Sequence, residues 1–176
     1  MTSKFTDSSA CRFGIYCIEN WQSGVCQVNF NWKLGNNVPH HSRGCAILAD
    51  RHTALSEGIR DLLETSFHTV YIVADSASLK EGAQRLSPAL VVLDMSLLGS
   101  DFAVLLKEVH ELSPESRVIV LSVHDQSSVA RQALACGAQS VVLKRSIGSD
   151  LLMAVSAVLR GEEFVSPGIG LNDKLH

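Results

Sequence analysis

The sequence lacks several features that would assign it at once to a large class of proteins. No apolar run in its 176 residues is long enough to span a membrane, and Met1 is not followed by a secretory signal pattern. Lysine and arginine are not clustered and the net charge is −3, so no basic surface for nucleic acid is predicted. These absences favour a cytoplasmic protein with no membrane contact.

The spacing of a zinc site is absent as well. Cys11, Cys17 and Cys26 precede two adjacent histidines, His40 and His41, but the chain has no CxxC or HxxxH pattern. Unpaired cysteines are therefore favoured over zinc ligands. The other two cysteines lie in apolar periodic segments, as is typical of reduced residues in a protein core.

Residues 1–43 differ in composition from the rest of the chain. They mix aromatic residues with asparagine, serine and glycine, and no helical period is sustained. The stretch GNNVPHHSRG, rich in turn residues, marks a boundary. Since 46% apolar content is enough for one core, we expect one main domain at 44–162. Residues 1–43 are then an extension that is a candidate for disorder, and residues 163–176 a short tail.

From residue 44 onward, short apolar runs alternate with segments of helical spacing. The predicted strands lie at 45–50, 69–75, 89–94, 117–122 and 140–144. The predicted helices follow them at 53–66, 78–86, 101–112, 127–137 and 148–161. The strands have no polar face, which predicts a parallel sheet covered on both sides. We expect an α/β, flavodoxin-like, doubly wound sheet of five strands in the order 2-1-3-4-5.

Polar side chains stand where these strands end. Asp50, Asp94, Ser122 and Lys144 follow the first, third, fourth and fifth strands. In the predicted order, the first and third strands are neighbours, so Asp50 and Asp94 would share one crevice. One carboxylate can attack phosphorus, while the other helps to hold a divalent cation. The hydroxyl and the ammonium can bind the remaining phosphoryl oxygens.

Each of these residues alone also has a structural explanation. Asp50 is a common residue at a helix N-cap, Ser122 can cap its own loop, and Lys144 can be an ordinary solvated side chain. Their occurrence at strand ends in this order favours the functional interpretation. The sequence therefore predicts a phosphoryl-transfer site.

Five stretches of the chain carry a family resemblance: ILADRHTALSEGIRDLLE, VVLDMSLLGSD, VIVLSVHD, ALACGAQSVVLK and AVLRGEEFVSP. Through them, residues 45–167 resemble the receiver domain of two-component response regulators, of the NarL/LuxR-type branch. The resemblance implies a CheY-like fold, phosphorylation on Asp94, a switch hydroxyl at Ser122 and a phosphate-binding lysine at Lys144. It also implies a Mg²⁺ ion held by Asp94, the backbone carbonyl of Ser96 and acids that follow the first strand, here Asp50.

The chain departs from that family at the metal site. Receivers of this kind usually have two adjacent acids after the first strand, but the second position here is Arg51. Two interpretations are open. The guanidinium pairs with Asp94 and partly imitates the ion, or it points to solvent beside a site that binds Mg²⁺ weakly through Asp50.

Three further features bear on the switch and on the residues around it. Val141 stands where the family commonly has an aromatic residue that changes rotamer, and Leu98 stands where it often has proline. His52 and His124 flank the predicted site, and we assign them no catalytic role.

The expected output also differs from that of the NarL/LuxR branch. That branch continues into a helix-turn-helix domain, whereas this sequence stops at His176, so we expect no DNA binding by this polypeptide. The main hypothesis is an atypical receiver that signals by protein contact. Its partners would be a histidine kinase or phosphotransfer protein, or a second copy bound through the fourth helix and fifth strand.

Other hypotheses stay open. The chain is alternatively a phosphorylation-independent pseudo-receiver locked by Arg51, or a truncated remnant of a NarL/LuxR-type regulator. An enzyme of flavodoxin-like fold would need further acid and base residues, which the sequence does not offer. We therefore expect no enzymatic activity beyond phosphorylation of the domain itself.

Overall fold

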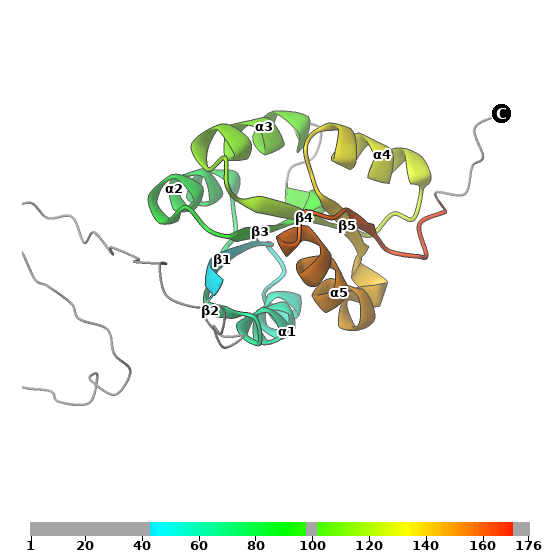
Figure 1. The fold of residues 1–176 in the computed structure, drawn as a ribbon, viewed down its shortest axis with the longest axis horizontal. Helices are drawn as coiled ribbons and strands as arrows, with labels where there is room; N and C mark the ends of the chain where they lie inside the picture. Colours follow the sequence, from blue (N-terminus) through cyan, green and yellow to red (C-terminus); the bar gives the residue numbers. More distant parts are fainter. Residues whose placement is uncertain (1–42, 98–101, 171–176) are drawn as a thin grey trace, which may run out of the picture. The chain divides into compact units, whose positions relative to one another are not determined.

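The computed structural model describes residues 43–97 and 102–170, which form strands and helices in alternation (Figure 1). The strands are β1 (Arg43–Ala49), β2 (Phe67–Val73), β3 (Leu90–Asp94), β4 (Arg117–Ser122), β5 (Ser140–Leu143) and β6 (Phe164–Val165). The α-helices are α1 (Thr53–Glu64), α2 (Ser76–Leu86), α3 (Phe102–Leu112), α4 (Ser127–Ala135) and α5 (Ile147–Leu159). Two 3₁₀ turns, η1 (Met95–Leu97) and η3 (Lys144–Ser146), follow β3 and β5.

All strands belong to one parallel sheet in the order β2-β1-β3-β4-β5-β6. The predicted fold class and the order of the first five strands are confirmed. The sheet has one strand more than expected, because β6 pairs with the edge of β5 at Ser140 and Val141. Two residues are too few to show a period in the sequence, so this strand fell within the predicted tail.

The sheet is covered on both faces, as the continuous apolar strands require. Helices α2, α3 and α4 lie on one face, and α1 and α5 lie on the other (Figure 1). Along β3, Val91 and Leu93 pack toward the first group, whereas Leu90 and Val92 pack toward the second. Both sets are fully buried, so the middle of the sheet has no face in contact with water.

Some predictions concern residues outside this description. Residues 1–42 of the predicted extension at 1–43, which include its three cysteines, and Leu98 lie outside the described residues. The domain boundaries drawn from the sequence stay predictions. In the part of the chain that is described, no helix combines the length and apolar character needed to cross a bilayer.

Ser166 fixes the segment that follows β6 against the end of β5. Its hydroxyl oxygen accepts the backbone N–H of Leu143 at 3.0 Å and donates to Asp150 Oδ2 at 2.5 Å. Ser149 donates to the other oxygen of Asp150 at 2.7 Å. Ser166 is fully buried and Asp150 is 8% exposed, so these bonds satisfy polar groups with little access to water.

We expect Ser166→Ala to lower the free energy of unfolding by about 1–3 kcal/mol, because it leaves the buried N–H of Leu143 without a partner. Urea denaturation measures the change. Ser140→Ala is the matched control, since Ser140 is also fully buried on β5 but its hydroxyl has no hydrogen-bond partner. That control removes a buried hydroxyl that has no partner, so it should not lower the free energy of unfolding. Equal losses in the two variants would contradict this account.

Candidate functional site

Two buried carboxylates meet at the carboxyl edge of the sheet. Asp50 directly follows β1, and Asp94 is the last residue of β3. The two strands are parallel neighbours, with Ala49 in register with Leu93, so both side chains emerge side by side. Asp50 is 2% exposed and Asp94 is 1% exposed. Two like charges this far from water need a counter-charge.

Lys144 provides that counter-charge from the end of β5. Its ammonium nitrogen lies 2.7 Å from Asp94 Oδ2 and 3.2 Å from Asp50 Oδ2. The side chain is 11% exposed, so the ammonium is largely withdrawn from water and shared between the two carboxylates. The structure therefore brings together three of the four residues predicted from the strand ends.

Ser96 closes a short turn back onto Asp94. Its backbone N–H donates to Asp94 Oδ1 at 3.1 Å, and its hydroxyl donates to Asp94 Oδ2. Burial alone would raise the pKa of Asp94, but the hydrogen bonds from Lys144 and Ser96 outweigh it and hold that pKa below its usual value. Asp94 is therefore a carboxylate at neutral pH.

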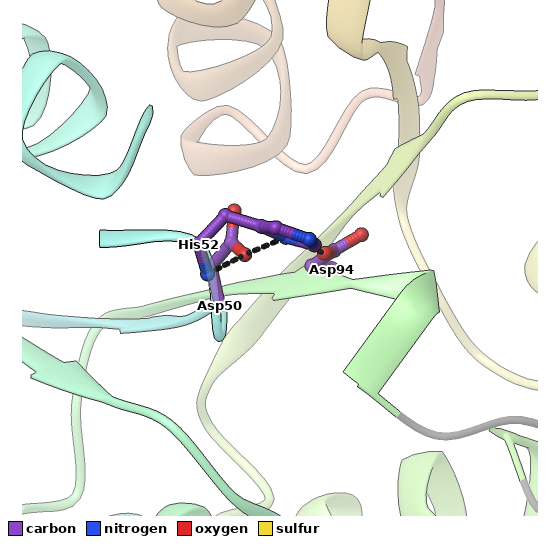
Figure 2. Close-up of side chains that lie close together, drawn as sticks. All are labelled: Asp50, His52 and Asp94. Atoms are coloured by element: carbon purple, nitrogen blue, oxygen red, sulfur yellow. Dashed lines mark hydrogen bonds and ion pairs between the residues drawn. The ribbon is translucent and has the colours of Figure 1, made fainter. Parts of the chain in front are cut away.

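His52, for which no catalytic role was predicted, also lies in the site. Its Nδ1 lies 3.0 Å from Asp50 Oδ1 and 3.6 Å from Asp94 Oδ2 (Figure 2). The backbone N–H of His52 donates to Asp50 Oδ1 at 2.8 Å, which turns the chain so that the ring reaches both carboxylates. The signal for this was its position two residues after Asp50, where an aspartate turn brings the chain back on itself.

Arg51 is an exposed residue of the loop after β1. Its guanidinium donates to the backbone carbonyl of Leu97 at 2.8 Å. Among the residues that the structure describes, it forms no ion pair with Asp94. This hydrogen bond joins the loop after β1 to the end of η1. Both interpretations of Arg51 stay predictions.

Ser122 is fully buried at the end of β4, and its hydroxyl is used within its own loop. The hydroxyl donates to the carbonyl of His124 and accepts the N–H of His124, both at 3.0 Å. These bonds are those of a loop cap, the structural alternative for Ser122. The predicted switch role of Ser122 stays a prediction.

Asp75 and Val141 have structural roles in the fold. Asp75, which follows β2, caps α2 by accepting the backbone N–H of Ser78 at 2.8 Å. Val141 is fully buried in the core beneath α3 and α4, and a β-branched side chain there has little rotamer freedom.

The donor atoms of this site suit a divalent cation. One ligand atom from each of Asp50, His52 and Asp94 can be chosen so that all three lie within 4.8 Å of one another. Two of the three are carboxylates, which are the ligands that Mg²⁺ prefers.

A parallel doubly wound sheet with paired acids and a lysine at its carboxyl edge is the arrangement of a signalling receiver module. The model of the response regulator receiver domain matches residues 46–156. The chain belongs to this family, the receiver domains of two-component response regulators. Such domains are signalling modules that interact with kinases or phosphodonors.

Curated relatives are transcriptional regulators of the branch expected from the sequence. The chain is 29% identical over 138 residues to the probable transcriptional regulatory protein NarL of Mycobacterium tuberculosis, covering 77% of this chain and 63% of that protein. It is 25% identical over 128 residues to DegU of Brevibacillus brevis, covering 72% and 54%. The chain therefore spans less than two thirds of the length of these relatives.

Solved structures agree with this assignment. A LuxR-family response regulator from Aurantimonas superposes with a TM-score of 0.67 at 27% identity, covering 73% of this chain and 94% of that one. The isolated receiver domain of RcsB from Salmonella enterica, in its apo form, gives 0.65 at 26% identity, covering 72% and 96%.

We expect Lys144→Met to lower the free energy of unfolding at pH 7 by about 1–3 kcal/mol, because two buried carboxylates lose their shared donor. The lowered pKa of Asp94 gives stability that is complete above its unfolded pKa of about 3.9 and is lost as the pH falls through the folded pKa. The deficit of the variant should therefore shrink below about pH 4. Urea denaturation at several pH values measures it.

The control for that experiment is Lys107→Met. Lys107 is 79% exposed and lies 3.8 Å from Glu111, so its loss should change stability by less than about 0.5 kcal/mol. A deficit in Lys144→Met that is the same at all pH values would contradict the assigned role of the ammonium.

Proposed function

We propose that this receiver domain accepts a phosphoryl group on Asp94 and passes the signal on by contact with other proteins. The observation that carries the proposal is the state of Asp94. It ends a buried strand, and the hydrogen bonds from Lys144 and Ser96 keep it ionised. A carboxylate held in this form is a nucleophile that needs no separate base.

The proposed reaction is a transfer of one phosphoryl group. A carboxylate oxygen of Asp94 attacks the phosphorus of a phosphodonor, such as the phosphohistidine of a histidine kinase or phosphotransfer protein. The bond from phosphorus to the donor breaks, and the donor leaves with that electron pair. The product on the domain is an acyl phosphate, whose oxygens Lys144 and Ser122 would bind.

Residues of this chain fit the divalent cation that the family uses. Asp50, Asp94 and the backbone carbonyl of Ser96 would hold Mg²⁺, which neutralises phosphoryl oxygens when it is bound. Because Arg51 stands where the family usually has a second acid, the site has one carboxylate fewer, and we propose that it binds Mg²⁺ weakly. The bond of Arg51 to Leu97 agrees with this, because the guanidinium has no acceptor atom and supplies no ligand in place of the missing acid.

Protein partners are part of the same proposal. Exposed residues of α4, namely Ser128, Arg131 and Gln132, offer a polar surface next to β5 for a kinase or a second copy of the domain. One solved structure of the similar protein RcsB is described as two dimers bound to two parallel DNAs. For this chain, dimer formation through α4 and β5 and the lack of DNA binding by this polypeptide stay predictions.

We expect incubation with Mg²⁺ and a small acyl phosphate to add one phosphoryl group to the protein, seen in the intact mass. Asp94→Asn should abolish the adduct, because an amide is not a nucleophile toward phosphorus. Asp61→Asn is the control, since Asp61 is 71% exposed on α1 and should leave the adduct unchanged. Failure of the unaltered protein to form any adduct would contradict the proposal and favour a phosphorylation-independent binding module.

We expect Arg51→Asp to tighten Mg²⁺ binding by about tenfold or more, because it adds a carboxylate ligand and removes a positive charge. Isothermal titration of the full chain with Mg²⁺ measures this. Arg51→Gln separates the two effects, since it removes the charge without adding a carboxylate, and should give a smaller gain. No gain in either variant would show that Arg51 does not limit the affinity for the ion.

A further inference from the structure

We propose that the imidazole of His52 is a metal ligand, so that this site prefers a divalent transition-metal ion such as Mn²⁺ or Co²⁺ over Mg²⁺. The inference rests on the proposed function in one respect, the binding of a divalent cation between Asp50 and Asp94. It goes beyond that function by changing the ligand set and the class of ion.

The distances between donor atoms support a shared ion. Two ligands at right angles, each about 2.1 Å from a metal ion, are about 3.0 Å apart. Nδ1 of His52 lies 3.0 Å from Asp50 Oδ1 and 3.6 Å from Asp94 Oδ2 (Figure 2). An ion near the middle of these three atoms is therefore within coordinating range of all of them after small adjustments.

A backbone hydrogen bond holds His52 beside Asp50. The N–H of His52 donates to Asp50 Oδ1 at 2.8 Å, so the residue is held by the same carboxylate that would share the ion. The side chain is 58% exposed, which leaves the ring room to adjust toward a metal. Asp50 and Asp94, in contrast, have fully buried side chains and are fixed in place.

Because position 51 is an arginine and not an acid, the nitrogen of His52 has a larger share in any ligand set at this site. Without a second carboxylate after β1, the site has two acids, and the guanidinium of Arg51 is bound to the carbonyl of Leu97. His52 is the next residue along the chain, and its ring nitrogen Nδ1 lies near both acids. Imidazole binds first-row transition metals well, whereas Mg²⁺ prefers oxygen ligands. With one carboxylate fewer and one imidazole added, the site should therefore bind transition-metal ions in preference to Mg²⁺.

A competing role for His52 is that of a simple hydrogen-bond donor. In that role Nδ1 carries a proton and donates it to Asp50 Oδ1, and no metal binds to nitrogen. The two roles differ in one observable. Only a ligand nitrogen gives a hyperfine coupling between the imidazole ¹⁴N and a bound Mn²⁺ ion.

The test uses the full chain freed of any histidine tag and loaded with one equivalent of Mn²⁺. Pulsed electron paramagnetic resonance should show ¹⁴N coupling in the unaltered protein and none in His52→Ala. Titrations with Mn²⁺ and Mg²⁺ should show a preference for Mn²⁺ that His52→Ala reduces about tenfold. His68→Ala is the control, because His68 is exposed near the start of β2, at the opposite edge of the sheet.

An all-oxygen site also has some preference for Mn²⁺, so only the part that depends on His52 counts as support. Absence of ¹⁴N coupling in the unaltered protein would overturn the inference, whether or not the variant folds. An unchanged Mn²⁺ to Mg²⁺ ratio in His52→Ala would also overturn it.

The phosphoryl adduct, measured with saturating Mg²⁺ on the same preparation, separates this inference from the proposed function. An adduct without nitrogen coupling means that phosphorylation stands and the role of His52 fails. Nitrogen coupling without an adduct means that the metal site stands and phosphorylation fails.

Discussion

Two carboxylates with no access to water repel each other at the ends of neighbouring strands, and one ammonium lies between them. Asp50 and Asp94 are brought together by the parallel pairing of β1 with β3, and Lys144 reaches them from the end of β5. The rest of the site depends on this arrangement. Ser96 forms hydrogen bonds with Asp94, and the ring of His52 forms one with Asp50. Both carboxylates can stay buried because the ammonium of Lys144 compensates their charge.

Much of the fold could be predicted from the sequence, because apolar runs and helical spacing are strong local signals. The strand at Arg117–Ser122 was placed to the residue, and the predicted helices differ from the observed ones by two residues or fewer at each end. The two-residue strand at Phe164–Val165 could not be predicted. It forms because the edge of β5 offers backbone partners, which is a tertiary effect without a period of its own.

The site was predictable as a set of residue types but not as a set of contacts. Strand ends in a parallel sheet converge, which brought Asp50, Asp94 and Lys144 together as expected. The partners of Arg51 and His52 were not predictable, because a long guanidinium can reach several carbonyls and a ring follows the local turn. The hydroxyl of Ser122 shows the same limit, since its bonds depend on the path of its own loop.

The hydrogen bonds to Asp94 make its two oxygens chemically unequal. Oδ2 accepts the ammonium of Lys144 and the hydroxyl of Ser96, whereas Oδ1 accepts one backbone N–H. Stabilisation of a reactant that is not kept in the transition state adds to the activation barrier. Lone pairs on Oδ2 are therefore the less basic and the slower to form a new bond. The hydrogen bonds that keep Asp94 ionised therefore also slow an attack by Oδ2. Oδ1, which accepts only one backbone N–H, is the more nucleophilic oxygen.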